Sequence, residues 1–262
     1  MKLHDKTAVI TGAGSGIGRA LARGFAKEGA CVTIADINSD QAESVAREIE
    51  GAGGNAVAIH ADVSKKQDVR QLVEKTVERW GKIDVLVNNA AIVGAPPLNC
   101  LDIREETWER TLAVNLTGVL LCSQCAARKM IQQNTGGKII NISSISGQVY
   151  IGAAPNYHVS KAGIIMLTKA MAVEFAQYSI QVNAIGPGLI ETPSTKPLLE
   201  IPGNREYATN TVPGKRIGRP YDIVGPALFL ASRESDFVTG QTIFVDGGFL
   251  YFNPTVPVES YS

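Results

Sequence analysis

The sequence predicts an α/β protein in which helices cover both faces of a doubly wound, mainly parallel sheet. Three observations support this fold class. Short, β-branched apolar runs alternate with longer amphipathic segments along most of the chain. A glycine-rich run lies between the first apolar run and the first amphipathic segment. Hydrophobic residues make up 45% of the 262 residues, which allows one large core. Because parallel neighbours need a crossover connection, this alternation indicates helices on both faces of the sheet.

Seven strands and seven helices follow from the periodicity. The predicted strands span residues 7–11, 31–35, 56–60, 83–88, 138–143, 180–185 and 242–245. The predicted helices span residues 16–28, 39–52, 65–80, 104–112, 115–134, 156–177 and 221–231. We therefore expect a single domain, residues 1–262, built as a Rossmann fold on a seven-stranded sheet.

Two segments depart from the alternation. Residues 188–220 contain five prolines and show no sustained periodicity. A long insertion after the carboxyl end of a strand lies where ligands bind in such sheets, so we expect it to form a substrate lid. The tail, residues 249–262, is aromatic and rich in proline, which favours an interface. The alternative for the tail is packing against its own subunit.

The charge balance excludes some classes of partner. Lysine plus arginine and aspartate plus glutamate number 25 each, so no net field holds nucleic acid or an anionic membrane. No basic and apolar leader opens the sequence, and no apolar run reaches the roughly 18 residues of a membrane span. We expect a cytoplasmic protein that acts on a small molecule, with no nucleic-acid or membrane partner.

Cysteines and histidines give no sign of a metal or a disulfide framework. The four cysteines are few and scattered. Cys122 and Cys125 have the C-x-x-C spacing of redox and metal sites, but they fall inside an apolar helical stretch, which favours ordinary buried thiols. The histidines His4, His60 and His158 have no metal-ligand spacing. We expect no metal site.

The glycine-rich run from residue 11 to residue 18 has the sequence TGAGSGIG. Between a strand and a helix, such a run lets a pyrophosphate approach the backbone, because Cβ atoms are missing and helix-terminal N–H groups face the anion. A glycine run by itself indicates only a turn. In this context it predicts a dinucleotide-binding turn that comprises Gly12, Ser15, Gly16, Ile17 and Gly18.

Asp36 lies at the end of the second predicted strand, eighteen residues after Gly18. A carboxylate at this place accepts hydrogen bonds from the adenosine ribose and repels a 2′-phosphate, which favours NAD over NADP. Ser15 and Ile37 supply no positive charge to offset that repulsion. The alternative is that Asp36 caps the following helix.

Tyr157 and Lys161 are spaced four apart, which puts a phenol and an ammonium on one face of a helix, about one turn apart. A fixed cation beside a phenol lowers the pKa of the phenol from its usual value near 10. The pair therefore has the chemistry of a proton-transfer device. The alternative is an exposed contact between two neighbours on a helix.

From about residue 6 to residue 248, the sequence resembles the short-chain dehydrogenase/reductase family. Several independent motifs in one register carry this resemblance, namely Thr11-Gly12-x-x-x-Gly16-x-Gly18, Asn88-Asn89-Ala90-Ala91, Asn115, Ser144 and Tyr157-x-x-x-Lys161. The resemblance implies further cofactor contacts, with the adenine at Asp62 and Val63, with the strand end at Asn89, Ala90 and Ala91, and on the nicotinamide side at Pro187, Gly188, Ile190 and Thr192.

The resemblance also implies a catalytic tetrad. Tyr157 would be the general base for alcohol oxidation and the acid for carbonyl reduction. Lys161 would lower the pKa of Tyr157 and hold the nicotinamide ribose. Ser144 would donate a hydrogen bond to the reacting oxygen. Asn115, at the start of its helix, would fix a water that links Lys161 to solvent. These roles agree with the chemistry of the residues, because a proton donor needs a tuned pKa and developing charge on oxygen needs an oriented donor.

Three residues in or beside the family motifs, Ser144, Ala91 and His158, have an alternative or a departure from the usual pattern. Ser144 is preferred to Ser143 because it stands thirteen residues before Tyr157, as the family's serine does, and Ser143 then points to the other face of the strand end. Ala91 replaces the glycine usual in the family, so a positive φ at this position would strain the backbone. His158 points about 100° away from Tyr157 on the helix, so we expect a surface or interface role for it.

The substrate is expected between the strand ends and residues 188–220. The predicted substrate-binding residues are Ser144, Ser146, Gln148, Tyr150, Tyr157 and Leu189, with Val93 at the boundary of the pocket. The polar groups of Ser146 and Gln148 favour a polyol, sugar or small hydroxy-ketone, although Gln148 can equally face solvent. We expect an NAD-dependent dehydrogenase of a secondary alcohol. The alternatives are an NADPH-dependent 3-oxoacyl thioester reductase and a dinucleotide-binding sensor without catalysis.

The resemblance alone indicates the oligomeric state, and it implies that the protein would form a homotetramer. The helices beginning near Asn115 and Asn156 would form the main interface. The last strand and the aromatic tail would form another.

Overall fold

The computed structural model describes residues 1–94, 96 and 98–251. In this part of the chain, seven parallel strands form one sheet in the order β3-β2-β1-β4-β5-β6-β7. The strands are β1 (Thr7–Thr11), β2 (Cys31–Asp36), β3 (Asn55–His60), β4 (Val85–Asn88), β5 (Gly137–Ile142), β6 (Ile180–Pro187) and β7 (Thr242–Val245). The predicted doubly wound α/β fold is confirmed, and the described sheet is parallel throughout.

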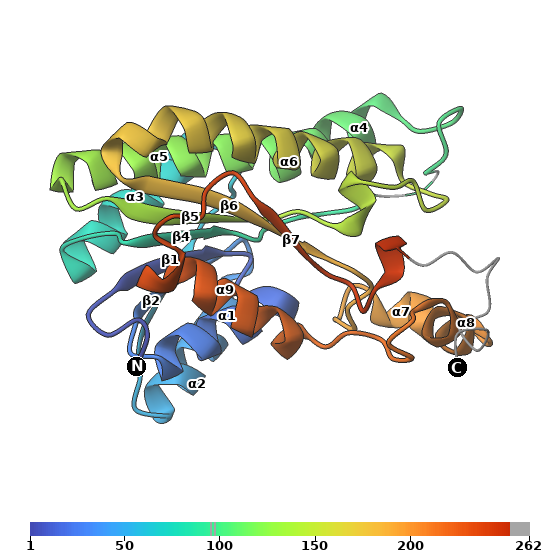
Figure 1. Ribbon diagram of the computed structural model, residues 1–262, viewed down its shortest axis with the longest axis horizontal. Helices are drawn as coiled ribbons and strands as arrows, with labels where there is room; N and C mark the ends of the chain where they lie inside the picture. Colours follow the sequence, from blue (N-terminus) through green and yellow to red (C-terminus); the bar gives the residue numbers. More distant parts are fainter. Residues whose placement is uncertain (95, 97, 252–262) are drawn as a thin grey trace.

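Helices cover both faces of the sheet (Figure 1). One face carries α3 (Lys66–Trp80), α5 (Gly118–Gln133) and α6 (Pro155–Phe175), and the other carries α1 (Gly16–Lys27), α2 (Ser39–Gly51) and α9 (Val224–Ala231). The helix α4 (Glu105–Leu112) leads into α5. Short helices α7 (Lys196–Leu199) and α8 (Asn204–Thr211) lie together beyond one end of the sheet.

The core consists of two apolar layers, one on each face of the sheet. Ile10 and Ile34 pack with the α1, α2 and α9 side, whereas Val9 and Leu86 pack with the α3, α5 and α6 side. Successive residues of a strand point to opposite faces, so one buried strand feeds both layers. This explains why the strands are continuous apolar runs and why the helices between them are amphipathic.

The strand order reverses between β1 and β4, which pair directly with Ile10 opposite Val87. In doubly wound sheets, ligands bind in the crevice outside the carboxyl ends of the strands at such a switch point. Here the crevice lies beside the glycine-rich turn, which joins β1 to α1, and beside the segment after β4. The fold therefore brings the two motifs together although about seventy residues separate them.

Most predicted elements agree with the structure to within two residues, and the largest difference is in residues 188–220. That stretch was expected to lack periodicity, but it contains α7 and α8. Two contacts tie it to its surroundings: the backbone bridge between Ile190 and Gly218, and the ion pair of Arg205 with Glu191 at 2.6 Å. Of the aromatic tail, residues 249–251 form a short 3-10 helix and the rest lies outside the described residues.

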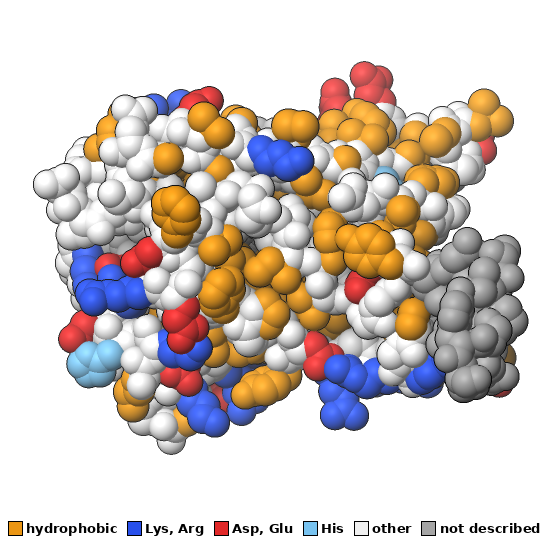
Figure 2. All heavy atoms as spheres, viewed as in Figure 1, with side chains coloured by type: hydrophobic (Ala, Val, Ile, Leu, Met, Phe, Trp, Pro, Cys, Tyr) orange, Lys and Arg blue, Asp and Glu red, His pale blue; other side chains and the backbone are white. Residues whose placement is uncertain are grey.

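The surface charges and the position of Cys122 are as the sequence predicts. Acidic and basic side chains are interspersed on the face shown in Figure 2. Cys122 is buried in the core, and burial raises the pKa of its thiol to about 12. In the described part of the chain, no helix is both long enough and apolar enough to cross a membrane.

Candidate active site

The turn between β1 and α1 has the shape that the glycine spacing predicts. Gly12 has a φ of +61°, and a Cβ on it would lie 2.7 Å from the Cα of Ala90. A Cβ on Gly18 would overlap the carbonyl oxygen of Gly12. Ser15 makes no capping hydrogen bond in the described structure, so the first-turn amides of α1 face outward without a side-chain partner. This turn fits a pyrophosphate, which needs close backbone approach and free N–H groups.

The segment after β4 is fastened to this turn by side-chain hydrogen bonds. Asn89 donates from Nδ2 to the carbonyls of Thr11 and Gly12, both at 2.9 Å. The Thr11 hydroxyl accepts from the backbone N–H groups of Asn89 and Ala90, at 3.0 and 3.1 Å. Ala91 is not among the residues with positive φ, so alanine at this position is unstrained. The crevice at the switch point thus has a fixed shape.

Asp36 is the last residue of β2, and its carboxylate reaches the glycine-rich turn. Oδ2 accepts from the Gly14 N–H at 2.8 Å, and Oδ1 accepts from the Asn38 N–H at 2.9 Å. The cap of α2 is Asn38, whose side chain accepts from the Gln41 N–H at 3.0 Å. The capping alternative for Asp36 is therefore wrong. The exposed Ile37 beside it adds no positive charge.

Asp62 and Val63, the expected adenine contacts, follow β3 and are both buried. Burial alone would raise the pKa of Asp62, but hydrogen bonds from Ser64 and Arg110 outweigh it, so the pKa is lowered. The Ser64 hydroxyl lies 2.6 Å from Oδ1, and Arg110 lies 3.2 Å from Oδ2. Asp62 is thus a fixed anion. Sequence spacing gave no sign of Arg110, which lies 48 residues away.

Ser144, Tyr157 and Lys161 come together at the carboxyl end of β5. Ser144 follows the strand and caps the 3-10 turn Ile145–Gly147, because its hydroxyl accepts from the Ser146 N–H at 3.1 Å. A further hydrogen bond joins Ser144 to Tyr157. Tyr157 lies in the first turn of α6, and the Nζ atom of Lys161 is 5.4 Å from the centre of its ring. The structure thus assembles three of the four predicted catalytic residues.

The pKa shifts of the pair correct one expectation. Burial raises the pKa of Tyr157 above its usual value, and the hydrogen bond from Ser144 opposes this. Burial also lowers the pKa of Lys161 to about 7, and its Nζ donates to the Ile142 carbonyl at 2.8 Å. The resemblance implied that Lys161 lowers the pKa of Tyr157. The net direction is the opposite here, because burial of the phenol outweighs the hydrogen bond from Ser144.

Asn115 differs from its expected placement at the start of a helix. It lies within a π-helical segment, Ala113–Thr117, which connects α4 to α5. Its side chain is fully buried and clamps Ile92, accepting from its N–H and donating to its carbonyl, both at 2.8 Å. Nδ2 also lies 3.1 Å from the Ser160 hydroxyl. Single π-helical turns inside α-helices are frequent at functional sites.

Ser143 is not an alternative to Ser144. Its hydroxyl is buried and donates to the backbone carbonyl of Lys161 at 2.8 Å. It therefore faces α6, rather than the opposite side as predicted. The contact joins the end of β5 to the second turn of α6, which helps to set the position of Lys161.

The predicted substrate residues lie at different depths. Ser146 is buried, whereas Gln148 and Tyr150 are exposed on the loop before α6, and Val93 is 45% exposed. Leu189 is half-buried in the segment after β6.

The residues predicted to lie on the nicotinamide side are at the end of β6 and just after it. Pro187 ends β6, and the Gly188 N–H donates to the Val245 carbonyl at 3.0 Å. The Ile190 side chain belongs to the core. Thr192 lies beside the glycine turn, where a Cβ on Gly16 would be 3.4 Å from its side chain.

His158, which we expected at a surface or an interface, is half-buried at the start of α6. Both of its ring nitrogens contact the loop before α6. Nδ1 is 2.9 Å from the Ala154 carbonyl, and Nε2 accepts from the Ile151 N–H at 3.1 Å. The ring also lies 4.7 Å from that of Tyr150. Helical spacing cannot reveal these contacts, because they depend on how the loop folds back.

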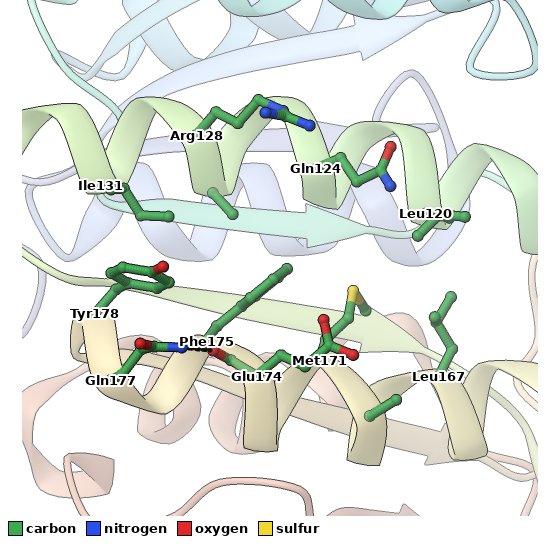
Figure 3. Close-up of a pocket in the computed structure, with 12 residues that line it drawn as sticks. Leu120, Gln124, Arg128, Ile131, Leu167, Met171, Glu174, Phe175, Gln177 and Tyr178 are labelled. Atoms are coloured by element: carbon green, nitrogen blue, oxygen red, sulfur yellow. Dashed lines mark hydrogen bonds between the residues drawn. The ribbon is translucent and has the colours of Figure 1, made fainter.

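The hollow shown in Figure 3 lies elsewhere, between α5 and α6. Leu120 and Ile131 of α5 face Leu167 and Phe175 of α6 across it. None of the predicted catalytic, cofactor-binding or substrate-binding residues lines it. It is therefore separate from the candidate active site.

Comparisons with known proteins show which family the chain is similar to. Residues 12–250 match the family model described as Enoyl-(Acyl carrier protein) reductase. The chain is 43% identical over 248 residues to the 3-oxoacyl-(acyl-carrier-protein) reductase FabG of Thermotoga maritima, covering 95% of this chain and 99% of that protein. It is 42% identical over 252 residues to an L-rhamnose 1-dehydrogenase (NAD(P)(+)) of Azotobacter vinelandii, covering 95% and 98%.

A solved structure is similar over nearly its whole length. It is the crystal structure of a gluconate 5-dehydrogenase from Burkholderia cenocepacia J2315 in complex with NADP and tartrate. The TM-score is 0.90 at 38% identity, with 96% of this chain and 98% of that chain covered.

Proposed function

Because the chain belongs to the short-chain dehydrogenase/reductase family, an oxidoreductase family that acts on CH–OH donors, we propose that it is an NAD-dependent dehydrogenase of a polyhydroxylated secondary alcohol. The observation that carries the proposal is the convergence of Ser144, Tyr157 and Lys161 at the carboxyl end of β5, on the same edge of the parallel sheet as the glycine turn. A proton-transfer group with an oriented hydrogen-bond donor next to a dinucleotide cradle supports hydride chemistry on a carbonyl or alcohol.

The proposed cofactor is NAD, bound along the crevice at the switch point. Gly12, Ser15, Gly16, Ile17 and Gly18 would hold the pyrophosphate. The other proposed contacts are Asp36 and Ile37 at the ribose, Asp62 and Val63 at the adenine, and Asn89, Ala90, Ala91, Pro187, Gly188, Ile190, Thr192, Tyr157 and Lys161 along the rest of the cofactor. The bound nicotinamide would supply the hydride acceptor or donor.

Each catalytic side chain would then have one task. In oxidation, the phenolate of Tyr157 takes the proton from the substrate hydroxyl while a hydride leaves the carbon that bears this hydroxyl. In reduction, the phenol of Tyr157 gives a proton to the carbonyl oxygen. With substrate bound, Ser144 would donate its one proton to the reacting oxygen instead of to Tyr157, while one of its lone pairs still accepts from the Ser146 N–H. Lys161 holds the nicotinamide ribose, and Asn115 fixes the segment at Ile92 and a water that links Lys161 to solvent.

The raised pKa of Tyr157 has a consequence for this scheme. A buried neutral phenol is a good proton donor and a poor base. Reduction therefore finds Tyr157 ready in its protonated form, whereas oxidation requires added positive charge near the phenol. The protonated form of Lys161 and the positively charged oxidised nicotinamide would both provide it.

The choice of NAD rests on Asp36. Its carboxylate lies at the turn and would face the ribose hydroxyls, where a 2′-phosphate would meet a fixed negative charge. Both cofactors occur among the relatives, since the L-rhamnose 1-dehydrogenase is named for NAD(P)(+) and the gluconate 5-dehydrogenase structure contains NADP. The preference proposed here therefore comes from this chain's own residues.

The proposed substrate is a polyol, a sugar or a sugar acid. The rhamnose and gluconate dehydrogenases among the relatives support this class. Gln148 and Tyr150 on the exposed loop supply polar groups that can bind hydroxyls. The second candidate is an NADPH-dependent reductase of a 3-oxoacyl thioester, which the similarity to FabG favours and Asp36 disfavours.

The test is a substrate panel with both cofactors. Sugars, polyols, sugar acids and a 3-oxoacyl thioester are incubated with NAD, NADP or their reduced forms, and absorbance at the reduced-nicotinamide band is followed. The proposal predicts the highest kcat/KM for NAD with a polyhydroxylated substrate. A higher value for NADPH with the thioester would establish the second candidate. Cofactor binding without turnover on any substrate would favour the sensor.

Four further expectations accompany this function and stay predictions. We propose that residues 1–262 form one catalytic domain and that residues 188–220 close over the substrate. We propose a homotetramer and a cytoplasmic location. Limited proteolysis with and without NAD tests the closure, and sedimentation equilibrium tests the oligomeric state.

A further inference from the structure

The loop that joins the 3-10 turn Ile145–Gly147 to α6 carries the exposed residues proposed to bind substrate. Its last residue, Ala154, has a φ of +58°, in the left-handed region that alanine rarely adopts. The Ala154 N–H donates to the Leu98 carbonyl at 2.8 Å. The loop therefore has a strained end, and contacts from outside the loop must hold that end in place.

His158 provides two of these contacts from the first turn of α6. Its Nδ1 is 2.9 Å from the Ala154 carbonyl, which can only accept a hydrogen bond. Its Nε2 is 3.1 Å from the Ile151 N–H, which can only donate. The geometry therefore requires a neutral imidazole with the proton on Nδ1. With both nitrogens engaged, His158 has neither a proton nor a lone pair to offer a substrate.

The ring of His158 also connects the two tyrosines of the site. Its centre lies 4.7 Å from that of Tyr150, with a tilted geometry, and 6.3 Å from that of Tyr157, edge to face. Such aromatic contacts stabilise a fixed ring arrangement. The His158 imidazole thus contacts both the backbone of the loop before α6 and the ring of Tyr150. It also lies next to the phenol of Tyr157, the proposed proton-transfer group.

We propose that His158 is a positioning residue that holds the substrate loop, residues 148–154, in the conformation that presents Gln148 and Tyr150 to the substrate. The proposal rests on the proposed function for the identity of the bound molecule. It assigns His158 to substrate binding and not to proton transfer. Loss of its hydrogen bonds therefore raises KM for the alcohol and leaves the chemical step and cofactor binding nearly unchanged.

The first test is independent of any substrate. The full chain is labelled with nitrogen-15 histidine, and the two ring nitrogens of each of its three histidines are observed by NMR. The signal that disappears in His158→Ala belongs to His158. The proposal requires a protonated Nδ1 and a bare Nε2. A proton on Nε2, or rapid exchange between the two forms, would overturn it.

The second test separates the two hydrogen bonds. In His158→Gln the side-chain oxygen can still accept from the Ile151 N–H, and in His158→Asn the side-chain amide can still donate to the Ala154 carbonyl. His158→Ala loses both. Hydrogen exchange of the Ile151 amide should accelerate in the Ala and Asn variants and stay slow in the Gln variant. Equal exchange in all three variants would contradict the clamp.

The third test is kinetic. For His158→Ala we expect KM for the alcohol to rise about tenfold, as the loss of two neutral hydrogen bonds predicts, with kcat within about threefold and KM for the cofactor unchanged. His158→Asn and His158→Gln should each restore part of the affinity. The matched control is Val159→Ala, because Val159 is exposed on the next position of α6. A fall in kcat at constant KM would show that His158 acts in catalysis.

The tests distinguish the two proposals. If the wild-type protein turns over no secondary alcohol, the proposed function fails, and the clamp is decided by the tautomer and by the exchange of Ile151. If turnover is found but KM does not respond to His158→Ala, the clamp has no role in substrate binding and the proposed function stands.

Discussion

The glycine turn follows β1 and the substrate loop follows the short turn after β5, with β4 between these two strands, and the two segments are held in different ways. At the glycine turn, Asn89 and Thr11 bind backbone groups, and a Cβ on Gly18 would overlap the Gly12 carbonyl. In the loop of residues 148–154, most side chains are exposed and one imidazole, that of His158, makes both side-chain hydrogen bonds to the backbone. Close backbone packing therefore fixes the proposed cofactor end, whereas the proposed substrate end depends on one side chain, that of His158, and on a few backbone hydrogen bonds such as that from Ala154 to Leu98.

This difference has a functional meaning. A dinucleotide presents the same pyrophosphate and ribose whatever the substrate, so its cradle can be fixed by close backbone packing. A loop held by few side-chain contacts can change its shape through a few substitutions. Two relatives, a 3-oxoacyl-(acyl-carrier-protein) reductase and an L-rhamnose 1-dehydrogenase, are named for different substrates.

The largest loss of folding stability and of cofactor affinity is expected where the backbone is most crowded. Gly18→Ala puts a Cβ against the Gly12 carbonyl and 2.6 Å from Nδ2 of Asn89. We expect the free energy of unfolding to fall by about 3 kcal/mol and dinucleotide affinity to fall at least about 100-fold. Denaturant unfolding and fluorescence titration with NADH measure the two effects. Unchanged affinity would mean that the turn does not hold the cofactor.

A second prediction concerns the buried ammonium. The folded pKa of Lys161 is about 7, below its unfolded value, so between about pH 7 and pH 10.5 the unfolded chain binds more protons and stability rises with pH. Below that range the buried charge costs a few kcal/mol, at about 1.36 kcal/mol per pKa unit. Lys161→Met should therefore be more stable than the wild type at pH 6, and the gap should close toward pH 10.

The control for that variant is Lys169→Met, because Lys169 is exposed on the same helix. Its stability relative to the wild type should not depend on pH. Lys161→Met should also lose turnover, by about 100-fold or more, since it removes the cation beside Tyr157. A gap in stability that widens with pH would contradict the burial of the ammonium.

The next effect is on cofactor choice. Asp36→Ala removes the carboxylate that accepts from the Gly14 N–H, and with it the repulsion of a 2′-phosphate. We expect the ratio of kcat/KM for NAD to that for NADP to fall by about tenfold, which corresponds to about 1.4 kcal/mol. Asp40→Ala removes an exposed carboxylate nearby and should leave the ratio unchanged. An unchanged ratio in Asp36→Ala would overturn the assignment of NAD.

The smallest effect is a control for the glycine arguments. A Cβ at Gly51, in the last turn of α2, would meet no atom within 4 Å, and this residue has no positive φ. Gly51→Ala should stabilise the protein by up to about 1 kcal/mol, because alanine favours the helix, and should leave kinetics unchanged. Thermal unfolding measures the shift. If Gly51→Ala destabilised the protein as much as Gly18→Ala does, crowding would not be the cause of the effect at Gly18.

Much of this fold follows from local chemistry and was predictable from the sequence. The bounds of β1 and β7 agree residue for residue, because β-branched runs between turn residues are short-range signals. The placement of Asp36 at the glycine turn also follows, since a strand, a turn and a helix of ordinary length bring the two together.

Other features depend on long-range packing, which a pattern along the chain does not contain. The π-helical segment Ala113–Thr117 encloses Asn115, whose partner Ile92 is 23 residues away. The helices α7 and α8 are short, and the ion pair that joins Glu191 to Arg205 bridges 14 residues. The direction of the pKa shift of Tyr157 depends on burial, and the spacing to Lys161 alone indicates the wrong direction.

The most direct test of the proposed mechanism is Tyr157→Phe, which removes the phenolic oxygen and keeps the ring. NAD affinity is measured by titration, and turnover is measured at the reduced-nicotinamide band on the best substrate of the panel. The account predicts unchanged stability, nearly unchanged NAD affinity and a loss of turnover of about a thousandfold, as expected for removal of a general acid–base group. A variant that keeps most of its turnover would contradict it.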